Sequence, residues 1–374
     1  MENAYNRDNP FLAKIAQRFS LSKEGSKKKT MHLVIDISGS HMHYSVGDSL
    51  AICPRNDPEL VQKTLKSLKL HGTETVVDRH GHSYPFAEFL SSHVNLRTIS
   101  KKFVQTMAEK AHKQELQVVL ENPDWKEHLA SHEVWDFLHK YPEARFEAQE
   151  IASLLLPLLP RFYSIASSQA EVGDEVHLTV AYLDYETEGK RRLGTCTHYL
   201  YELAPLNSPE IPVYIHPGHD FRPPEKHETS IIMIGPGTGV APFRGFMQDR
   251  VVKAHSGKNW LFFGEWTRER EFFYEEEWLK WEKQGILRLS LAFSRDQPEK
   301  VYVQHRMLEH AEELYRWLEE GALIYVCGDA HQMAKDVEKT LHTILMQQGH
   351  LSESEAHDYI KRLRKEKRYL RDVY

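Results

Sequence analysis

A short apolar run that ends in three closely spaced glycines constrains this chain more than any other stretch. Residues 231–234 are β-prone, and Gly235, Gly237 and Gly239 follow them. Pro242 then suits the first turn of a helix, where its missing N–H would have no partner. A strand, a glycine loop and a helix in this order are typical of a dinucleotide site, because glycine lets backbone N–H groups approach a phosphate. The third glycine of the usual G-x-G-x-x-G spacing is absent, so the motif alone does not fix the ligand.

Size and composition exclude several classes of protein. The chain has 374 residues, 41% of them hydrophobic, which is enough for two packed cores. A formal net charge of −6 gives no reason to expect a nucleic acid partner. The start shows no signal-peptide pattern and no run of about 18 apolar residues occurs, so we expect a soluble protein without a membrane span. Three scattered cysteines favour the reducing cytoplasm over a disulfide framework, and the 23 histidines contain no H-E-x-x-H, so we predict no metal site.

Two patterns of apolar residues, one typical of strands and one typical of helices, divide the chain. Alternating apolar residues such as Leu33, Ile35 and Ile37 predict β-strands, whereas a helical apolar spacing follows Asp57, a good N-cap before Pro58. Beyond residue 225, apolar runs alternate with helical stretches, which is typical of a parallel sheet with helices on both faces. The predicted divisions are a lead-in segment over residues 1–30, an antiparallel β-barrel over 31–57 and 151–225, a helical connecting insert over 58–150, and a doubly wound α/β domain over 226–374.

Two places in the barrel region carry chemistry. Alternation on a strand puts Arg161 and Tyr163 on one face, where an arginine can pair with a phosphate and a tyrosine can stack on a flat ring. The alternative is an ordinary strand with a half-buried tyrosine. Residues 194–197 precede a helical stretch, with Thr197 as the expected N-cap, and free N–H groups at a helix start suit a pyrophosphate. The alternative there is an ordinary turn and cap.

The α/β region adds a polar cluster at the ends of its strands. Ser294 and Arg295 end one apolar run, and Lys300 and Tyr302 follow shortly. Ligands of open α/β sheets bind at the carboxyl ends of the strands, and two cations there would suit the 2′-phosphate that distinguishes NADP from NAD. The alternative is a polar loop. Cys327 ends the last apolar run, where a cysteine is usually a small buried hydrophobe.

Taken together, these motifs resemble the ferredoxin–NADP reductase module of NADPH-dependent diflavin reductases, with the sulfite reductase flavoprotein subunits as the nearest group. The similarity runs from about Asn9 to the end of the chain. The motifs that carry it are residues 161–168, 232–243, 294–297, 325–330 and 371–374.

The resemblance implies an FAD-binding barrel and an NADP-binding domain, with electrons passing from NADPH to FAD and onward. Ser164, Cys327 and Asp372 would surround the reacting centre, and Tyr374 would shield the isoalloxazine and swing away for hydride transfer. The residues implied for FAD are Arg161, Phe162, Tyr163, Ser164, Thr179, Val180, Ala181, Tyr185, Gly194, Thr195, Cys196 and Thr197. The residues implied for NADPH are Thr238, Ser294, Arg295, Lys300, Val301, Tyr302, Val303, Gln304 and Asp336.

Two departures and one absence qualify the resemblance. Ala181 and Thr195 stand where the nearest relatives have glycines, so each could crowd FAD. Relatives carry an FMN-binding flavodoxin domain before this module, and we expect this chain to lack it. The expected acceptor is therefore a separate flavodoxin-like carrier or a sulfite reductase hemoprotein-like subunit. The alternatives are a reductase with another acceptor, such as a ferredoxin, and a non-catalytic docking subunit that keeps the fold.

Overall fold

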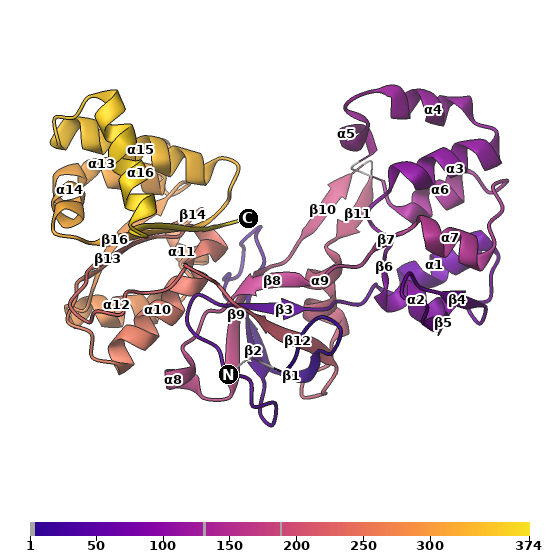
Figure 1. Cartoon of the computed structure of the whole chain (residues 1–374), viewed down its shortest axis with the longest axis horizontal. Helices are drawn as coiled ribbons and strands as arrows, with labels where there is room; N and C mark the ends of the chain where they lie inside the picture. The colour runs from indigo at the N-terminus through magenta and orange to yellow at the C-terminus, as the bar shows by residue number, and fades with distance from the viewer. Residues whose placement is uncertain (1–3, 130–131, 188) are drawn as a thin grey trace.

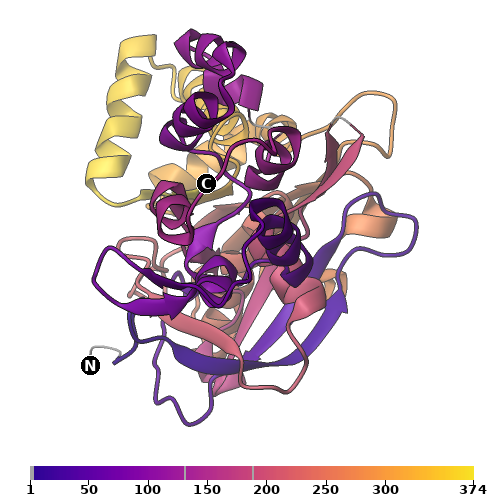
Figure 2. The ribbon, with the colours of Figure 1, turned by 90° about the vertical axis from the view of Figure 1, so that its right-hand side faces the viewer.

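The computed structural model describes residues 4–129, 132–187 and 189–374, and it divides into a β-barrel, a helical insert and an α/β lobe. The barrel lies between the other two parts in Figure 1. Figure 2 views the molecule from the side of the insert. Within the described residues, no helix is both long and apolar enough to cross a membrane.

The barrel is a six-stranded antiparallel sheet in the order β8-β3-β12-β1-β2-β9. A bridge between Ile165 and Leu178 joins its two end strands and closes it. Alternate residues of the strands, such as Leu33 and Ile35, are buried in the barrel core. The strands are β1 (Phe11–Ser20), β2 (Thr30–Asp36), β3 (Ser49–Ile52), β8 (Arg161–Ser164), β9 (Glu175–Ala181) and β12 (Ile211–His216).

The expected lead-in over residues 1–30 is wrong for β1, which pairs with both β2 and β12 inside the barrel. Ala13 and Ile15 point into the core and are at most 1% exposed. The register shifts between Ile15 and Gln17, which marks a β-bulge. A bulge breaks the two-residue alternation, so only a short piece of the strand pattern is left in the sequence.

The helical insert has a hydrophobic core of its own, which includes Leu65, Phe86, Phe103 and Ile151. As predicted, Asp57 caps the first helix: its side chain accepts a hydrogen bond from the N–H of Glu59. Its helices are α1 (Pro58–Leu68), α2 (Phe86–Ser92), α3 (Lys101–Ala111), α4 (Gln114–Glu121), α5 (Trp125–Leu129), α6 (Val134–Lys140) and α7 (Ala148–Leu154). Its short strands are β4 (Thr75–Val77), β5 (Ser83–Pro85), β6 (Val94–Asn95) and β7 (Leu156–Pro157).

A hairpin of β10 (Asp184–Thr187) and β11 (Lys190–Leu193) reaches from the barrel to the insert (Figure 1). Arg192 is buried at this junction and pairs with Glu133 at 3.1 Å and with Asp136 at 2.7 Å. The remaining short elements of the barrel region are α8 (Gln169–Val172), α9 (Thr195–His198) and a π-helical turn over Tyr199–Leu203.

The α/β lobe contains a five-stranded parallel sheet in the order β15-β14-β13-β16-β17. Successive strand residues face opposite cores: Ile232 packs toward the helices α13 to α16, and Met233 toward α10 and α12. The strands are β13 (Ile231–Ile234), β14 (Asn259–Glu265), β15 (Leu287–Phe293), β16 (Leu323–Gly328) and β17 (Tyr369–Val373). The helices are a 3₁₀ turn (Gly237–Val240), α10 (Ala241–Val252), α11 (Arg268–Glu271), α12 (Glu275–Lys283), α13 (Val303–Glu309), α14 (Ala311–Glu319), α15 (Met333–Gln348) and α16 (Glu353–Lys365).

Candidate functional site

Two cavities lie side by side where the barrel meets the α/β lobe. The first has a volume of about 590 Å³ and is lined by Ala181, Thr238 and Tyr374 among others. The second has a volume of about 410 Å³ and lies at the ends of β14 and β15. Lys28 and Glu265 line both of them, so the cavities share a wall. Cavities of this size hold nucleotide-sized ligands.

One carboxylate oxygen joins the three residues that the resemblance placed at the reacting centre. The hydroxyl of Ser164, on β8, donates a hydrogen bond of 2.6 Å to Oδ2 of Asp372, on β17. The Cys327 sulfur, on β16, lies 3.8 Å from the same oxygen. Burial raises the pKa of the Cys327 thiol well above its usual value, and the nearby Asp372 carboxylate raises it further. The thiol therefore stays protonated and can donate to the carboxylate.

Tyr374 is held by its backbone and exposes its ring. Its N–H donates to the Gly328 carbonyl at 3.1 Å, and its own carbonyl accepts from the N–H of Ala330 at 3.0 Å. The side chain is 61% exposed, and its hydroxyl makes one hydrogen bond of 3.0 Å, with Oγ1 of Thr238. The ring can thus turn away while the chain end stays in place.

Strand β8 presents its predicted residues on two faces. Tyr163 packs against the barrel core, and burial together with the neighbouring Cys196 raises its pKa well above the usual value. Arg161 is exposed. Phe162 is 51% exposed, and its ring lies 4.7 Å from that of His216 on the other face of the strand. The structure therefore separates Phe162 from Tyr163.

The three predicted residues of β9 differ in their exposure and in their contacts. Ala181 is exposed and lines the first cavity, whereas Val180 is buried in the barrel core. The Thr179 hydroxyl is hydrogen-bonded at 2.6 Å to the hydroxyl of Tyr274. Strand β9 pairs with β2 as far as Ala181. On its other side, the bridge that joins β9 to the end of β8 is at Leu178, so this side of β9 is an open edge beyond Leu178. Tyr185 is 45% exposed on the hairpin.

The glycine turn before α9 is too tight for a side chain. A Cβ on Gly194 would lie 2.7 Å from Oγ1 of Thr197 and 2.9 Å from Cβ of Leu183. The expected cap at Thr197 is wrong, because α9 begins at Thr195 with Gly194 as its N-cap. The Thr197 hydroxyl instead donates to the Gly194 carbonyl at 3.2 Å, inside the helix. Cys196 is buried, and burial raises the pKa of its thiol to about 12.

These features fit FAD. The first cavity offers space for a flat ring, and the edge of β9 offers backbone partners for it. The unpaired N–H groups expected in the first turn of α9 offer a site for a pyrophosphate. Only glycine fits at position 194, because a Cβ there would press against Leu183 and Thr197 of the turn itself.

The second cavity gathers most of the residues predicted for NADPH: Ser294, Arg295, Lys300, Tyr302, Val303, Gln304 and Asp336 all line it. Arg295 and Lys300 are exposed, so both cations can meet a phosphate. Val301 instead packs against the core of the lobe, and Thr238 lines the first cavity beside Tyr374.

Sequence reasoning missed Lys28, Glu265 and Trp266 at the wall between the cavities. The Lys28 ammonium contacts the two carboxylate oxygens of Glu265 at 2.8 and 2.9 Å and lies 4.6 Å from the centre of the Trp266 ring. Lys28 comes from the loop between β1 and β2, which was predicted as a lead-in. No spacing marks these residues, because they meet only when the barrel and the lobe are packed together.

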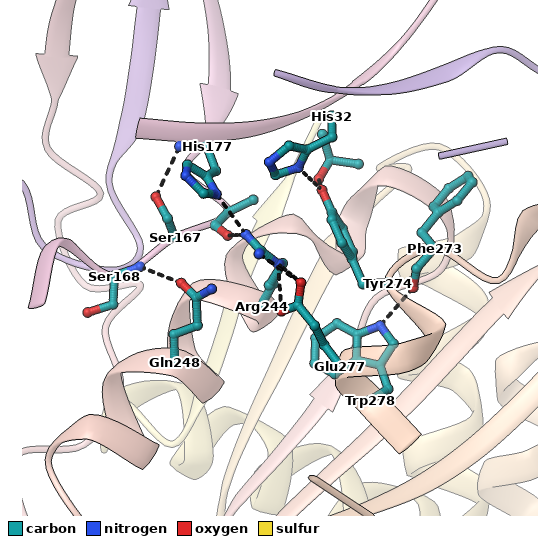
Figure 3. Close-up of polar contacts among 12 residues, drawn as sticks. His32, Ser167, Ser168, His177, Arg244, Gln248, Phe273, Tyr274, Glu277 and Trp278 are labelled. Carbon is teal, nitrogen blue, oxygen red and sulfur yellow. Dashed lines mark hydrogen bonds and ion pairs between the residues drawn. The ribbon is translucent and has the colours of Figure 1, made fainter. Parts of the chain in front are cut away.

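A second missed group joins the barrel and the α/β lobe (Figure 3). Arg244 on α10 pairs with Glu277 at 2.8 Å and donates to the Ala166 carbonyl at 2.8 Å. Its guanidinium also lies 4.7 Å from the ring of Tyr274, whose hydroxyl is 3.0 Å from Nδ1 of His32. The network therefore joins α10 and α12 of the lobe to the barrel.

Comparisons with known proteins agree with this geometry. Residues 3–199 match the family model described as "FAD binding domain", and residues 233–339 match "Oxidoreductase NAD-binding domain". The chain is similar to the sulfite reductase (NADPH) flavoprotein alpha-component of Bacillus subtilis, with 41% identity over 379 residues that cover 100% of this chain and 62% of the relative. The protein of that name from Vibrio cholerae is 42% identical, and the one from Neisseria meningitidis serogroup A is 43% identical, with 61% and 62% of their lengths covered and 100% of this chain in both cases. The chain thus spans about 62% of the length of these curated relatives.

Proposed function

This chain belongs to the FAD binding domain family and continues into an oxidoreductase NAD-binding domain, and from that premise we propose that it is an NADPH-dependent FAD oxidoreductase. It takes hydride from NADPH and passes electrons to a separate acceptor protein. The proposal depends on one observation: Ser164, from the barrel, and Cys327, from the α/β lobe, both contact one carboxylate oxygen of Asp372.

FAD would be held by the barrel. The pyrophosphate would lie at the first turn of α9, between Gly194 and Thr197, with Arg161 as the nearby cation. The ring would lie between Tyr163 and Tyr374, with backbone partners on Thr179, Val180 and Ala181. Bound FAD supplies the hydride acceptor and the ability to release electrons one at a time.

The second cavity would recognise the phosphorylated end of NADPH. Arg295 and Lys300 supply two cations, and the hydroxyls of Ser294 and Tyr302 lie in the same wall. An arginine binds a phosphate through two parallel N–H donors. NADH lacks the 2′-phosphate, so it could not accept these hydrogen bonds.

The chain's own residues then prepare the reacting centre. Asp372 accepts from the Ser164 hydroxyl and lies beside the protonated thiol of Cys327, so the donors and the acceptor are already oriented. Tyr374 releases Thr238 and turns aside, which frees both a ring-sized space and the Thr238 hydroxyl for the nicotinamide end.

The acceptor we propose is a flavodoxin-like carrier or a sulfite reductase hemoprotein-like subunit. The names of the relatives, which are sulfite reductase flavoproteins, support the hemoprotein-like partner, and the resemblance to diflavin reductases supports the flavodoxin-like carrier. A role in sulfite reduction and a cytoplasmic location are part of the same proposal.

The test uses the purified full chain reconstituted with FAD. NADPH should bleach the flavin absorbance under anaerobic conditions, and NADH at the same concentration should do so at least tenfold more slowly. Reoxidation by a flavodoxin and by a sulfite reductase hemoprotein would then be compared with reoxidation by a ferredoxin. A protein that retains no FAD, or whose flavin is not bleached by NADPH, contradicts the proposal. Reoxidation by the ferredoxin alone contradicts only the choice of acceptor.

A further inference from the structure

Trp266 follows β14 directly and is fixed next to Arg295, which follows β15. The N–H of Arg295 donates to the Trp266 carbonyl at 2.8 Å, and the N–H of Ser294 donates to the Glu265 carbonyl at 2.9 Å. Two consecutive backbone hydrogen bonds therefore continue the pairing of β14 and β15 past the end of the strands. The two side chains start from positions that the sheet holds firmly.

The guanidinium of Arg295 lies over the indole, so close that only its flat face can approach the ring. Its central carbon is 3.3 Å from the centre of the Trp266 ring. Trp266 is half-buried, whereas Arg295 is exposed, so the ring forms the floor and the cation lies on the solvent side. The backbone N–H of Trp266 also donates to the Glu265 carboxylate at 2.8 Å, and this carboxylate is anchored by Lys28.

Stacking engages the face of the guanidinium and leaves its edge free. The N–H donors of arginine point outward in the plane of the group, so they remain available to an anion in the second cavity. Arg295 forms no ion pair within 4.0 Å with any residue that the structure describes. An arginine that is oriented before the ligand arrives loses less side-chain freedom on binding than one that moves freely in solvent.

We propose that Trp266 is a positioning residue that orients Arg295 toward the 2′-phosphate and thereby sets the preference for NADPH over NADH. The inference rests on the proposed function, because it assigns the second cavity to the phosphorylated end of NADPH. Trp266 acts through Arg295 and does not contact the reacting atoms.

The experiment compares the binding of adenosine 2′,5′-bisphosphate and of ADP, which lacks the 2′-phosphate, to the full chain by calorimetry. Trp266→Leu keeps an apolar side chain and removes the ring, and Trp266→Phe restores a smaller ring. A cation–π contact contributes about 1 kcal/mol, which is roughly a fivefold change in Kd. We expect Trp266→Leu to weaken the bisphosphate by about that factor and ADP by less than twofold, and Trp266→Phe to recover most of the loss.

Trp135 provides the matched control, because it is half-buried in the insert and also lies near a cation, 5.5 Å from the Lys190 ammonium. Trp135→Leu should change neither affinity. In an Arg295→Met background, Trp266→Leu should cause no further loss, since the residue through which it acts is gone. With NADPH as substrate, Trp266→Leu should raise KM and leave kcat within about twofold.

The outcomes separate the two ideas. If the unmodified protein binds the bisphosphate no better than ADP, the NADPH assignment itself fails, and the role of Trp266 falls with it. If the unmodified protein discriminates and Trp266→Leu keeps the same ratio of affinities, only the role of Trp266 is overturned. Equal weakening of both nucleotides also overturns it, because that is the signature of a general structural defect.

Discussion

At the scale of single residues, the oxygen Oδ2 of Asp372 is the atom at which the predicted residues of the reacting centre meet. It accepts the hydrogen bond of Ser164, and the Cys327 sulfur lies close to it, so one carboxylate orders a hydroxyl and a thiol at the junction of the lobes. A charged acceptor makes a stronger hydrogen bond than a neutral one. Asp372 is thus the residue whose change should separate the chemistry from the binding of the cofactors.

We expect Asp372→Asn to slow the reduction of FAD by NADPH by about 10- to 100-fold. The reason is the loss of a hydrogen bond to a charged group, which contributes about 1.5–3 kcal/mol. Single-turnover absorbance of the flavin measures the rate, and NADP⁺ titration checks that nucleotide binding is retained. Asp358→Asn, at an exposed position of α16, is the control and should leave the rate unchanged. An unchanged rate in Asp372→Asn with normal FAD content would contradict the assigned role.

Tyr374 gives a second prediction, because we propose that it shields the position that the nicotinamide would take. A binding site that is open for only a fraction of the time has an apparent affinity reduced by that fraction. Tyr374→Ala removes the shield, so the Kd for NADP⁺ should fall by about three- to tenfold. Tyr374→Phe keeps the ring and loses only the 3.0 Å bond to Thr238, so its effect should be smaller but in the same direction. Weaker NADP⁺ binding in both variants would show that Tyr374 supports the nucleotide.

The ordered motifs predicted which side chains would meet between the lobes, whereas residues outside those motifs were missed. Ser164, Cys327 and Asp372 were predicted together, and the structure brings them within hydrogen-bonding reach. Lys28 and Trp266 were missed, because a lysine in a basic run and a lone aromatic carry no spacing signal. The roles assigned to the predicted residues in binding FAD and NADPH remain predictions.

At the scale of the elements, the β10–β11 hairpin is what ties the insert to the barrel. Arg192 on β11 is 4% exposed and pairs with Glu133 and Asp136 of the insert. Arg97 pairs with the same Glu133, and Lys190 with the same Asp136, so each buried carboxylate contacts two cations. A network of this kind is costly to break, because each remaining partner stays buried and uncompensated.

We expect Arg192→Met to lower the free energy of unfolding by about 3 kcal/mol, the loss typical of a broken buried pair. The neighbouring Arg191 provides the control, since it is exposed and pairs with Asp184 of the same hairpin at 2.8 Å. Arg191→Met should cost less than about 1 kcal/mol, as exposed pairs do. Urea denaturation followed by circular dichroism measures both. Equal losses in the two variants would show that the buried network does not hold the insert.

The elements were predictable where the apolar period survives and were missed where it is interrupted. The helices of the insert keep their spacing, and β13 to β16 are continuous apolar runs, so both were found. Strand β1 was missed because of its bulge, and β17 because it forms the edge of the sheet after the basic helix α16. Apart from the lead-in, which β1 contradicts, the residue limits that divide the chain into domains remain predictions.

At the scale of the whole molecule, the barrel and the α/β lobe are joined by contacts that no local pattern reveals. Nδ1 of His177, in the barrel, lies 3.2 Å from the Arg244 guanidinium of the lobe, and the centre of the His177 ring lies 4.8 Å from that of His32 (Figure 3). Burial, helped by Arg244 and His177, lowers the pKa of His32 to about 2. Burial and Arg244 also lower the pKa of His177, although the Glu175 carboxylate, 3.0 Å away, acts in the opposite direction.

The sign of the pH effect follows from these shifts. In the unfolded chain, His32 titrates near its ordinary pKa of about 6.5, so below that pH the unfolded state binds a proton that the folded state does not. Stability is therefore complete above pH 6.5 and is lost as the pH falls from 6.5 toward 2. Between pH 8 and pH 5, His32 alone should remove about 2 kcal/mol from the free energy of unfolding.

Comparing the unmodified protein with His32→Asn isolates this contribution from the other histidines, because an asparagine amide can replace Nδ1 opposite the Tyr274 hydroxyl without titrating. Urea denaturation at pH 8 and pH 5 should show a pH-dependent loss about 2 kcal/mol smaller in His32→Asn than in the unmodified protein. His80→Asn, at an exposed position of the insert, should behave as the unmodified protein does. If His32→Asn loses as much stability on acidification as the unmodified protein, His32 is not held neutral between the lobes, and the Arg244 network is more open to solvent than its burial indicates.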